Sequence, residues 1–150
     1  EVCPGEMIGL VGHSGAGKST LSRISLECGK KVLSDDLNAV LDVHGTPRVE
    51  GLPFAGDLGL TASEPCSYPL RGLFRLEKGE RTRLRPMARA ETVASLLSCA
   101  PGVNLDGYRQ SRLISTLDLL AQRIPAWVLT FTREGRMWDE ILEVTPNHMG

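Results

Sequence analysis

Residues 12–20 read Gly-His-Ser-Gly-Ala-Gly-Lys-Ser-Thr, which completes the pattern G-x-x-x-x-G-K-[ST] of a phosphate-binding loop. An apolar run at 7–11 precedes the loop, and the residues at 18–28 can continue as a helix. This order of strand, glycine-rich turn and helix is the context in which the pattern binds phosphate. The sequence therefore predicts a strand at 7–11, a helix at 18–28, and binding of a nucleoside triphosphate between them.

The positions of this loop have distinct chemical tasks. Its glycines let the backbone turn and direct successive N–H groups at phosphate oxygens, and the helix that follows adds the positive end of its dipole. Lys18 would reach the β- and γ-phosphates, and the Ser19 hydroxyl would ligate Mg²⁺. With ATP and Mg²⁺ as ligands, the predicted binding residues are Gly12, His13, Ser14, Gly15, Ala16, Gly17, Lys18, Ser19 and Thr20. We expect the side chain of His13 to point outward.

Two adjacent carboxylates, Asp35 and Asp36, follow an apolar pair downstream of the loop. The intervening chain is long enough for the helix, a turn and a second strand at 31–35. Because the carboxyl ends of parallel strands meet at one edge of a sheet, both carboxylates should arrive beside the phosphate loop. One of them, for which we name Asp36, would hold Mg²⁺ with Ser19, and the other would accept the proton of an incoming hydroxyl. The alternative is a solvated turn in which either carboxylate caps the next segment.

Composition sets wider limits on function. The chain of 150 residues suits one domain spanning 1–150, and its first residue is Glu1, so it is compatible with a fragment of a longer chain. A net charge of -1 does not favour nucleic-acid binding, and no apolar run is long enough to cross a membrane. The sequence has four cysteines, at Cys3, Cys28, Cys66 and Cys99. Their wide spacing, without a C-x-x-C pair, argues against a zinc site or a disulfide framework and fits a reducing cytoplasm.

The stretch at 42–69 is rich in glycine and proline, so we expect loops there, with a short strand around 48–50. Long loops are often functional, which makes this stretch a candidate lid or peptide groove. It contains Glu50 and Asp57, which rank below the aspartate pair as metal or substrate contacts. Further predicted elements are a hairpin of strands at 70–76 and 82–87, helices at 90–100 and 107–124, a strand at 126–132 and a helix at 137–142.

Two motifs together resemble a known family. The runs Gly-His-Ser-Gly-Ala-Gly-Lys-Ser-Thr-Leu-Ser and Val-Leu-Ser-Asp-Asp-Leu-Asn-Ala-Val resemble the nucleotide core of the HPr serine kinase/phosphorylases, which the ATP-dependent phosphoenolpyruvate carboxykinases share. The segment Tyr-Pro-Leu-Arg-Gly-Leu-Phe at 68–74 is similar to an Arg-Gly signature of the HPr kinases. The later elements resemble HPr kinase-like proteins of peptide-modification clusters, including lasso-peptide tail kinases. The resemblance implies an α/β fold with a P-loop core of this type, in which helices flank a mixed sheet.

The resemblance also implies an activity, namely ATP-dependent transfer of the γ-phosphoryl group to a seryl hydroxyl of a protein or peptide. By position, Lys18 and Ser19 would contact phosphate and Mg²⁺, Asp35 and Asp36 would supply the base and a metal contact, and Arg71 would steady the transferring group. Composition, the lack of a long apolar run and the cysteine spacing add a cytoplasmic location and no nucleic-acid or membrane partner to this prediction. The resemblance also allows a homo-oligomer, because family members often form rings.

Other interpretations stay open at this point. The same loop pattern also occurs near the start of transporter-type ATPase domains. The Leu-Ser-Gly-Gly-Gln-type segment and the strand ending in Asp-Glu that this class also needs are absent from the sequence. A nucleotide-binding module without catalysis is the second alternative, since Pro69 stands where HPr kinases carry a metal-holding Glu. Arginines crowd the segment 71–89, which is either an anion-binding edge or a charged, solvated pair of strands.

Overall fold

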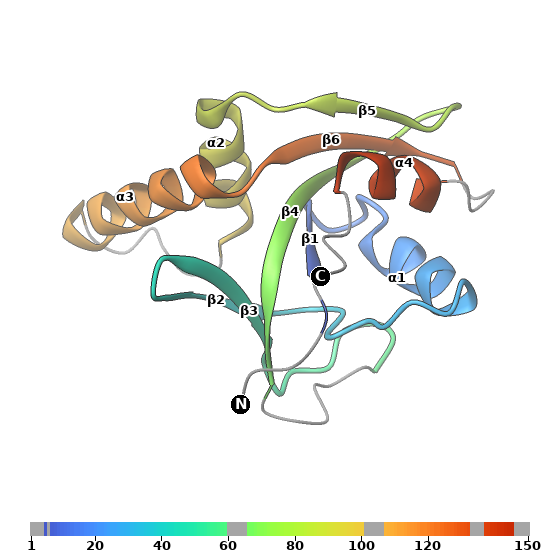
Figure 1. Cartoon of the computed structure of the whole chain (residues 1–150), viewed down its shortest axis with the longest axis horizontal. Helices are drawn as coiled ribbons and strands as arrows, with labels where there is room; N and C mark the ends of the chain where they lie inside the picture. Colours follow the sequence, from blue (N-terminus) through green and yellow to red (C-terminus); the bar gives the residue numbers. More distant parts are fainter. Residues whose placement is uncertain (1–4, 6, 60–65, 101–106, 133–136, 146–150) are drawn as a thin grey trace.

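The computed structural model describes residues 5, 7–59, 66–100, 107–132 and 137–145. Within these residues four helices flank one mixed sheet of six strands, which confirms the α/β prediction (Figure 1). The elements in chain order are β1 (Met7–Val11), α1 (Lys18–Glu27), β2 (Asn38–Val43), β3 (Thr46–Gly51), β4 (Ser67–Lys78), β5 (Arg83–Pro86), α2 (Arg89–Cys99), α3 (Gly107–Arg123), β6 (Ala126–Phe131) and α4 (Met137–Val144). No helix of this described part is long and apolar enough to cross a membrane.

The long strand β4 organises the sheet. It runs parallel to β1, with Val11 opposite Arg75, and parallel to β6, with Lys78 opposite Phe131. The phosphate loop leaves the end of β1, so it lies at the edge of the sheet where β4 and β6 also end. The strand at 7–11 is confirmed to the residue, and α1 begins at Lys18 as predicted.

The first part of β4 pairs with a hairpin that the sequence did not predict in full. The strands β2 and β3 are antiparallel and leave a two-residue turn at His44 and Gly45, whose φ angles are 51° and 81°. Positive φ at both central positions is the geometry of a type I′ turn, whose twist matches that of the flanking strands. The short strand expected around 48–50 is therefore the middle of β3. Of the stretch 42–69, the residues 60–65 lie outside the described part.

The predicted strand at 31–35 is wrong. The chain between Lys30 and Leu37 forms no strand, and the next strand begins at Asn38. Ser34 explains the difference, because its hydroxyl donates to the carbonyl of Leu37 at 3.3 Å and accepts from the N–H of Asp36 at 3.4 Å. A serine that bonds locally to the backbone favours a turn over a sheet ladder.

The predicted hairpin of 70–76 and 82–87 is also wrong, although both strands exist. β6 lies between them, parallel to β4 and antiparallel to β5. β4 and β6 are buried almost continuously, as central strands are, whereas the arginines of β5 are exposed, which suits an edge. At Gly79 a Cβ would lie 2.2 Å from Thr130 Cγ2, so glycine is required where the chain leaves β4 beside β6.

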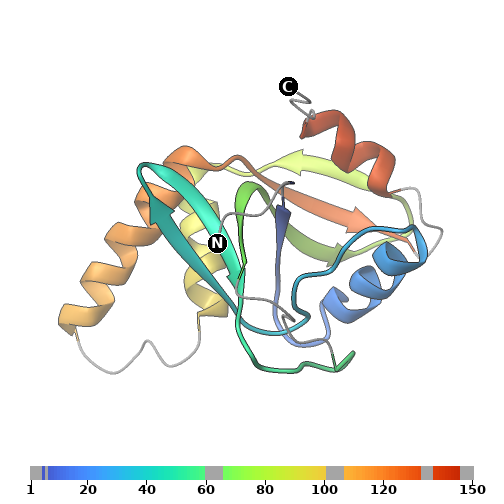
Figure 2. The same cartoon turned by 60° about the horizontal axis from the view of Figure 1, so that its bottom comes forward.

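Two layers of helices flank the sheet on different sides. In both views α1 and α4 lie on one side of β1 and β4, and α2, α3 and the β2–β3 hairpin lie on the other (Figures 1 and 2). One core lies under α1 and α4, around Leu21, Phe74 and Leu129, and Trp127 and Trp138 pack against it. The ring of Trp127 stacks on Phe74 with centroids 5.1 Å apart.

A second core gathers Tyr68, Leu70 and Ile124 near the hairpin. In this core Cys66 is disulfide-bonded, which the wide cysteine spacing did not predict. Cys28 and Cys99 are free thiols.

Candidate phosphate-binding site

The glycine-rich loop has the backbone that its sequence predicts. Gly15 and Gly17 have φ angles of 79° and 105°, in the left-handed region that favours glycine. At Gly17 a Cβ would also meet the ring of Phe131 at 2.7 Å, so the end of β6 presses on the loop. His13 and Ser14 are exposed, as expected for His13. The loop therefore packs against Phe131 at Gly17, while its residues His13 and Ser14 are exposed to solvent.

Lys18 folds back over this loop. Its Nζ donates hydrogen bonds to the carbonyls of Gly12 at 2.6 Å and His13 at 3.0 Å. Among the described residues, no side chain caps the N-terminus of α1, where Gly17 is the N-cap. Uncapped N–H groups, the positive end of the helix dipole and an ammonium group meet here, which is the arrangement that binds phosphate in other proteins.

Ser19 makes the contact that most changes the expected site. Its hydroxyl lies 3.1 Å from Oδ2 of Asp57, to which it donates a hydrogen bond. Asp57 is exposed and lies in the segment between β3 and β4. The hydroxyl that the loop motif assigns to a metal ion thus already faces a carboxylate. The pair offers two oxygen ligands of the kind that Mg²⁺ prefers.

Asp35 holds the segment that carries Asp57. One oxygen of its carboxylate accepts from the N–H of Gly56 at 3.1 Å, and the other accepts from the N–H of Leu58 at 2.5 Å. A Cβ on Gly56 would lie 2.9 Å from both Cγ and Oδ2 of Asp35, so the close approach requires glycine. Hydrogen bonds to a charged carboxylate are about twice as strong as neutral ones. Asp35 therefore positions Asp57 beside Ser19.

Asp36 has a different environment from its neighbour. It is exposed and lines the same cleft as the loop, Asp35 and Asp57. An exposed carboxylate at the wall of a cleft is available to a substrate, whereas both oxygens of Asp35 already accept backbone hydrogen bonds. The two adjacent aspartates thus lie beside the loop as predicted, although the predicted strand is missing, and they differ in their hydrogen bonding.

The backbone of Arg71 lies at the end of β1 opposite to the phosphate loop. It lies on β4 where β1 begins, between the register pairs Met7–Leu70 and Ile8–Gly72. The loop leaves the other end of β1, about four residues or roughly 13 Å farther along the strand. Arg71 lines a second, smaller cavity of about 410 Å³, whose lining also includes Lys18, Asp35 and Asp36. Lys78, at the carboxyl end of β4, is the cation of this strand that lines the cleft of the loop.

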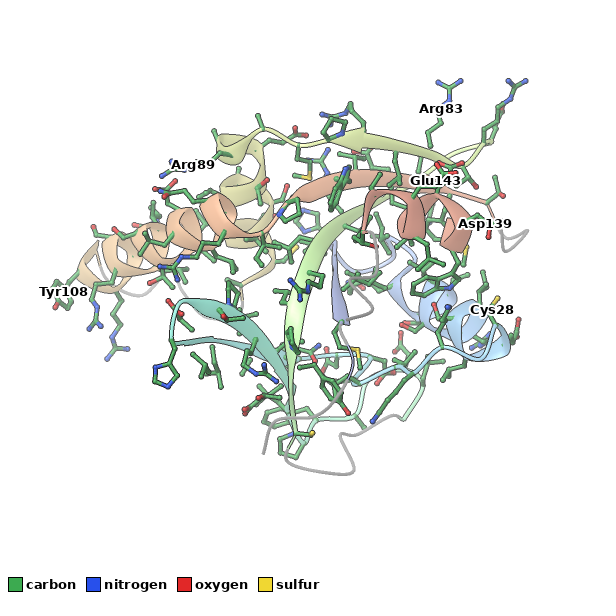
Figure 3. All side chains as sticks on the ribbon, in the orientation of Figure 1. Cys28, Arg83, Arg89, Tyr108, Asp139 and Glu143 are labelled. Carbon is green, nitrogen blue, oxygen red and sulfur yellow. The ribbon has the colours of Figure 1, made fainter. Side chains whose placement is uncertain are left out.

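Several arginines of the segment 71–89 are engaged in ion pairs. Arg85 donates to both oxygens of Glu91 at 3.0 and 2.7 Å, and Arg75 lies 3.1 Å from the same carboxylate. The hydrogen bond from Arg85 lowers the pKa of Glu91, and the pairing of Arg89 with Asp118 lowers the pKa of that carboxyl. Arg83 extends from β5 into solvent (Figure 3). These pairs join β4, β5, α2 and α3, so this segment does not form a continuous anion-binding edge.

The sequence ranked Asp57 below Asp35 and Asp36 as a metal contact, whereas the structure places it beside Ser19. The only sequence signal of Asp57 was a carboxylate between glycines in a long loop. Glu50 lies in β3 opposite Ser67 and is not among the residues that line the cleft. Within the described residues, no group of three or more His, Cys, Asp or Glu side chains is arranged to hold a metal ion. A Mg²⁺ site does not need one, because this ion keeps several waters and binds through one or two carboxylates and the substrate phosphates.

No family model, curated protein or solved structure matches this chain. The residues of the site therefore carry the functional argument. They combine a phosphate cradle, a hydroxyl and carboxylate pair, and a free carboxylate in one cleft. This set can bind a triphosphate with a divalent cation and can accept a proton beside it.

Proposed function

We propose that this protein is an ATP-dependent serine kinase of the HPr kinase-like type, which transfers the γ-phosphoryl group of ATP to a seryl hydroxyl of a protein or peptide. The observation that carries the proposal is the contact of Ser19 with Asp57, held in place by Asp35, beside the lysine of the phosphate loop. A carboxylate fixed beside the metal-binding hydroxyl supports binding of the triphosphate together with Mg²⁺. The same proposal includes the P-loop core of the HPr kinases and carboxykinases and a cytoplasmic location.

In this proposal the loop and Lys18 bind the nucleotide. The backbone N–H groups of the loop contact the phosphates, and the Lys18 ammonium exchanges its carbonyl partners for β- and γ-oxygens. Ser19 and Asp57 are the residues that would hold Mg²⁺, which when bound neutralises charge on those oxygens. In this assignment Asp57 takes the role of the Mg²⁺-holding carboxylate, which the sequence analysis had given to Asp36.

The transfer step uses the free carboxylate. The seryl oxygen attacks the γ-phosphorus in line, the bond from that phosphorus to the β–γ bridging oxygen breaks, and ADP leaves with the electron pair. Asp36 accepts the hydroxyl proton, and Lys18 and Lys78 lower the energy of charge spread over the transferring group. Asp35 touches no reactant and acts as a positioning residue for Asp57. Because the backbone of Arg71 lies where β1 begins, we propose no direct role for this residue in the transfer step.

The test is transfer of label from γ-labelled ATP to a pool of serine-containing peptides, followed by mass spectrometry of the products. We expect phosphoserine with the wild-type protein and a loss of rate of about 10²-fold or more with Asp36→Asn, the usual scale for a positioned base. The matched control is Asp139→Asn, an exposed carboxylate on α4 (Figure 3), which should leave the rate unchanged. Binding of ATP without any labelled product would instead support a nucleotide-binding module.

A further inference from the structure

The cleft that contains the phosphate loop is larger than the loop needs. Its volume is about 1360 Å³, whereas a site for one small ligand usually measures about 300–1,000 Å³. Beyond the loop and the aspartates, its walls combine apolar side chains of β2 and α3 with polar ones such as Asn38, Asp42 and Thr116. The apolar side chains that matter most are Val40, Leu41, Leu113, Leu117, Leu119 and Leu120. The cleft therefore has a polar end for phosphate and a long arm that is mainly apolar.

The dimensions of this arm suit an extended chain. On one side the lining residues of α3 run from Leu113 to Arg123, which spans about 15 Å of helix. On the other side the lining residues of β2 run from Asn38 to Asp42, which spans about 13 Å of strand. Both walls match about four to five residues of extended polypeptide and exceed the length of a nucleobase.

The wall formed by β2 is an edge of the sheet. This strand is the last in the order β2-β3-β4-β6-β5, and its described ladder is with β3 alone. Its apolar side chains Val40, Leu41 and Val43 are 45%, 41% and 37% exposed. Proteins usually blunt a free edge with lysine, proline or a covering element. The described residues of β2 include neither lysine nor proline, so the edge is available for another strand.

One exposed ion pair joins the two walls. Arg123 at the end of α3 lies 2.5 Å from Asp42 of β2, with side chains 40% and 56% exposed. Such a pair contributes only about 0–1 kcal/mol and does not hold the walls together firmly. The helix α3 itself has no buried residue and packs mainly on α2. Near its end, Leu120 of α3 packs against the second core, so any widening of the arm would have to come from the part of α3 before it.

We propose that the acceptor reaches the active site as an extended, apolar-rich polypeptide segment that adds as a strand to the free edge of β2 and lays alternate side chains on the leucines of α3. This inference rests on the proposed kinase function and names the form of its substrate. The unpaired N–H and C=O groups of β2 select this occupant, because a polypeptide backbone pairs with them and an acyl chain or nucleobase does not. Alternation along a strand turns every second side chain of the segment toward α3.

The experiment measures peptide binding in the absence of nucleotide. The probes are fluorescent synthetic peptides in which apolar residues alternate with polar residues around a central serine. Controls are the same peptides with proline at alternate positions, which cannot complete a ladder of hydrogen bonds. We expect the first set to bind, the proline set to bind at least about tenfold more weakly, and hydrogen exchange of the β2 amides to slow when peptide is present.

Variants on the two walls test the location. Leu41→Asp and Leu119→Asp should each weaken peptide binding by about tenfold or more, because a carboxylate must lose water against apolar side chains. Matched controls are Leu26→Asp on α1 and Ile114→Asp on α3, which lie outside the cleft and are 43% and 40% exposed, against 41% for Leu41 and 52% for Leu119. These controls should bind peptide as the wild type does.

Three outcomes would overturn the inference. The alternating peptides bind no better than the proline set, or the wall variants behave as their controls, or the wall variants weaken ATP binding in place of peptide binding, which would make the arm a nucleoside pocket. Because peptide binding is measured without ATP, failure of phosphoryl transfer leaves this result intact. Retained transfer with no binding at β2 would reject the docking site and spare the kinase.

Discussion

Ser19 and Asp57 are hydrogen-bonded at 3.1 Å although 38 positions separate them in the chain. One belongs to the first turn of α1 and the other to the segment between β3 and β4. The candidate metal site is therefore assembled from two distant parts of the sequence. Its geometry depends on Asp35, which fixes the second part through the N–H groups on both sides of Asp57.

Asp57→Asn should raise the Mg²⁺ concentration needed for half-maximal activity by about tenfold or more, the scale for loss of a group that supports a metal site. The amide keeps the size of the side chain but removes its negative charge. Activity measured against Mg²⁺ concentration checks this, with Asp139→Asn on α4 as the control for an exposed carboxylate. An unchanged Mg²⁺ requirement would remove Asp57 from the site.

Gly56→Ala tests the role of Asp35 without touching a charge. The added Cβ would lie 2.9 Å from the Asp35 carboxylate and 3.0 Å from its carbonyl oxygen, so the segment must shift. We expect a loss of about 1–3 kcal/mol in the free energy of unfolding, as for other overpacked sites, and a fall in kcat. Denaturant titration and steady-state kinetics measure the two effects.

Gly107→Ala is the matched control for that substitution. A Cβ at Gly107 meets no atom within 4 Å, and alanine favours the helix that begins there. It should leave the free energy of unfolding and kcat at or slightly above their wild-type values. If Gly56→Ala behaved in the same way, Asp35 and its loop would have no positioning role.

Arg71→Lys should change kcat by less than about twofold, in contrast to the roughly 10³-fold or greater loss expected of an arginine that steadies a transferring phosphoryl group. The resemblance assigned that role to Arg71, but the residue lies where β1 begins, away from the loop. Comparing its kinetics with those of Arg83→Lys on β5 settles the point. A selective collapse of kcat in Arg71→Lys would show that the arginine reaches the nucleotide after all.

The ion pairs of Glu91 predict a pH dependence of stability. Hydrogen bonding from Arg85 lowers the pKa of Glu91 in the folded state. The stabilisation is therefore complete above the pKa of an unfolded glutamate and is lost as the pH falls through the lower, folded pKa. The difference in Tm between the wild type and Glu91→Gln should be largest near neutral pH and shrink in acid. The control Glu143→Gln, an exposed residue of α4 (Figure 3), should show no such trend.

The local signals of the sequence predicted the elements well. The apolar run at 7–11, the glycines of the loop and the helical spacings of α1, α2 and α3 depend on neighbours along the chain, and these predictions are confirmed. The strand at 31–35 failed because Ser34 makes a turn with its own backbone, a competition that apolar periodicity does not reveal.

Pairing across the chain was harder to predict. Adjacent strands with a short connection suggested a hairpin, but the more apolar β6 takes the central place beside β4 and displaces β5 to the edge. The same limit applies to the site. Asp35 and Asp36 were found as a motif, whereas Asp57 becomes visible only when Gly56 packs against Asp35. A contact between distant loops leaves no local pattern in a single sequence.

The central claim is that the loop at 12–20 binds ATP. The most direct test is isothermal calorimetry, in which ATP with Mg²⁺ is titrated into the wild-type protein and into Lys18→Ala. Lys18 now donates to the carbonyls of Gly12 and His13, and a triphosphate would take over those bonds. We predict that the wild type binds ATP and that Lys18→Ala loses this binding, with its folded structure preserved. Equal ATP affinity in the two proteins, or no ATP binding by the wild type, would contradict the assignment of the loop and the kinase function that depends on it.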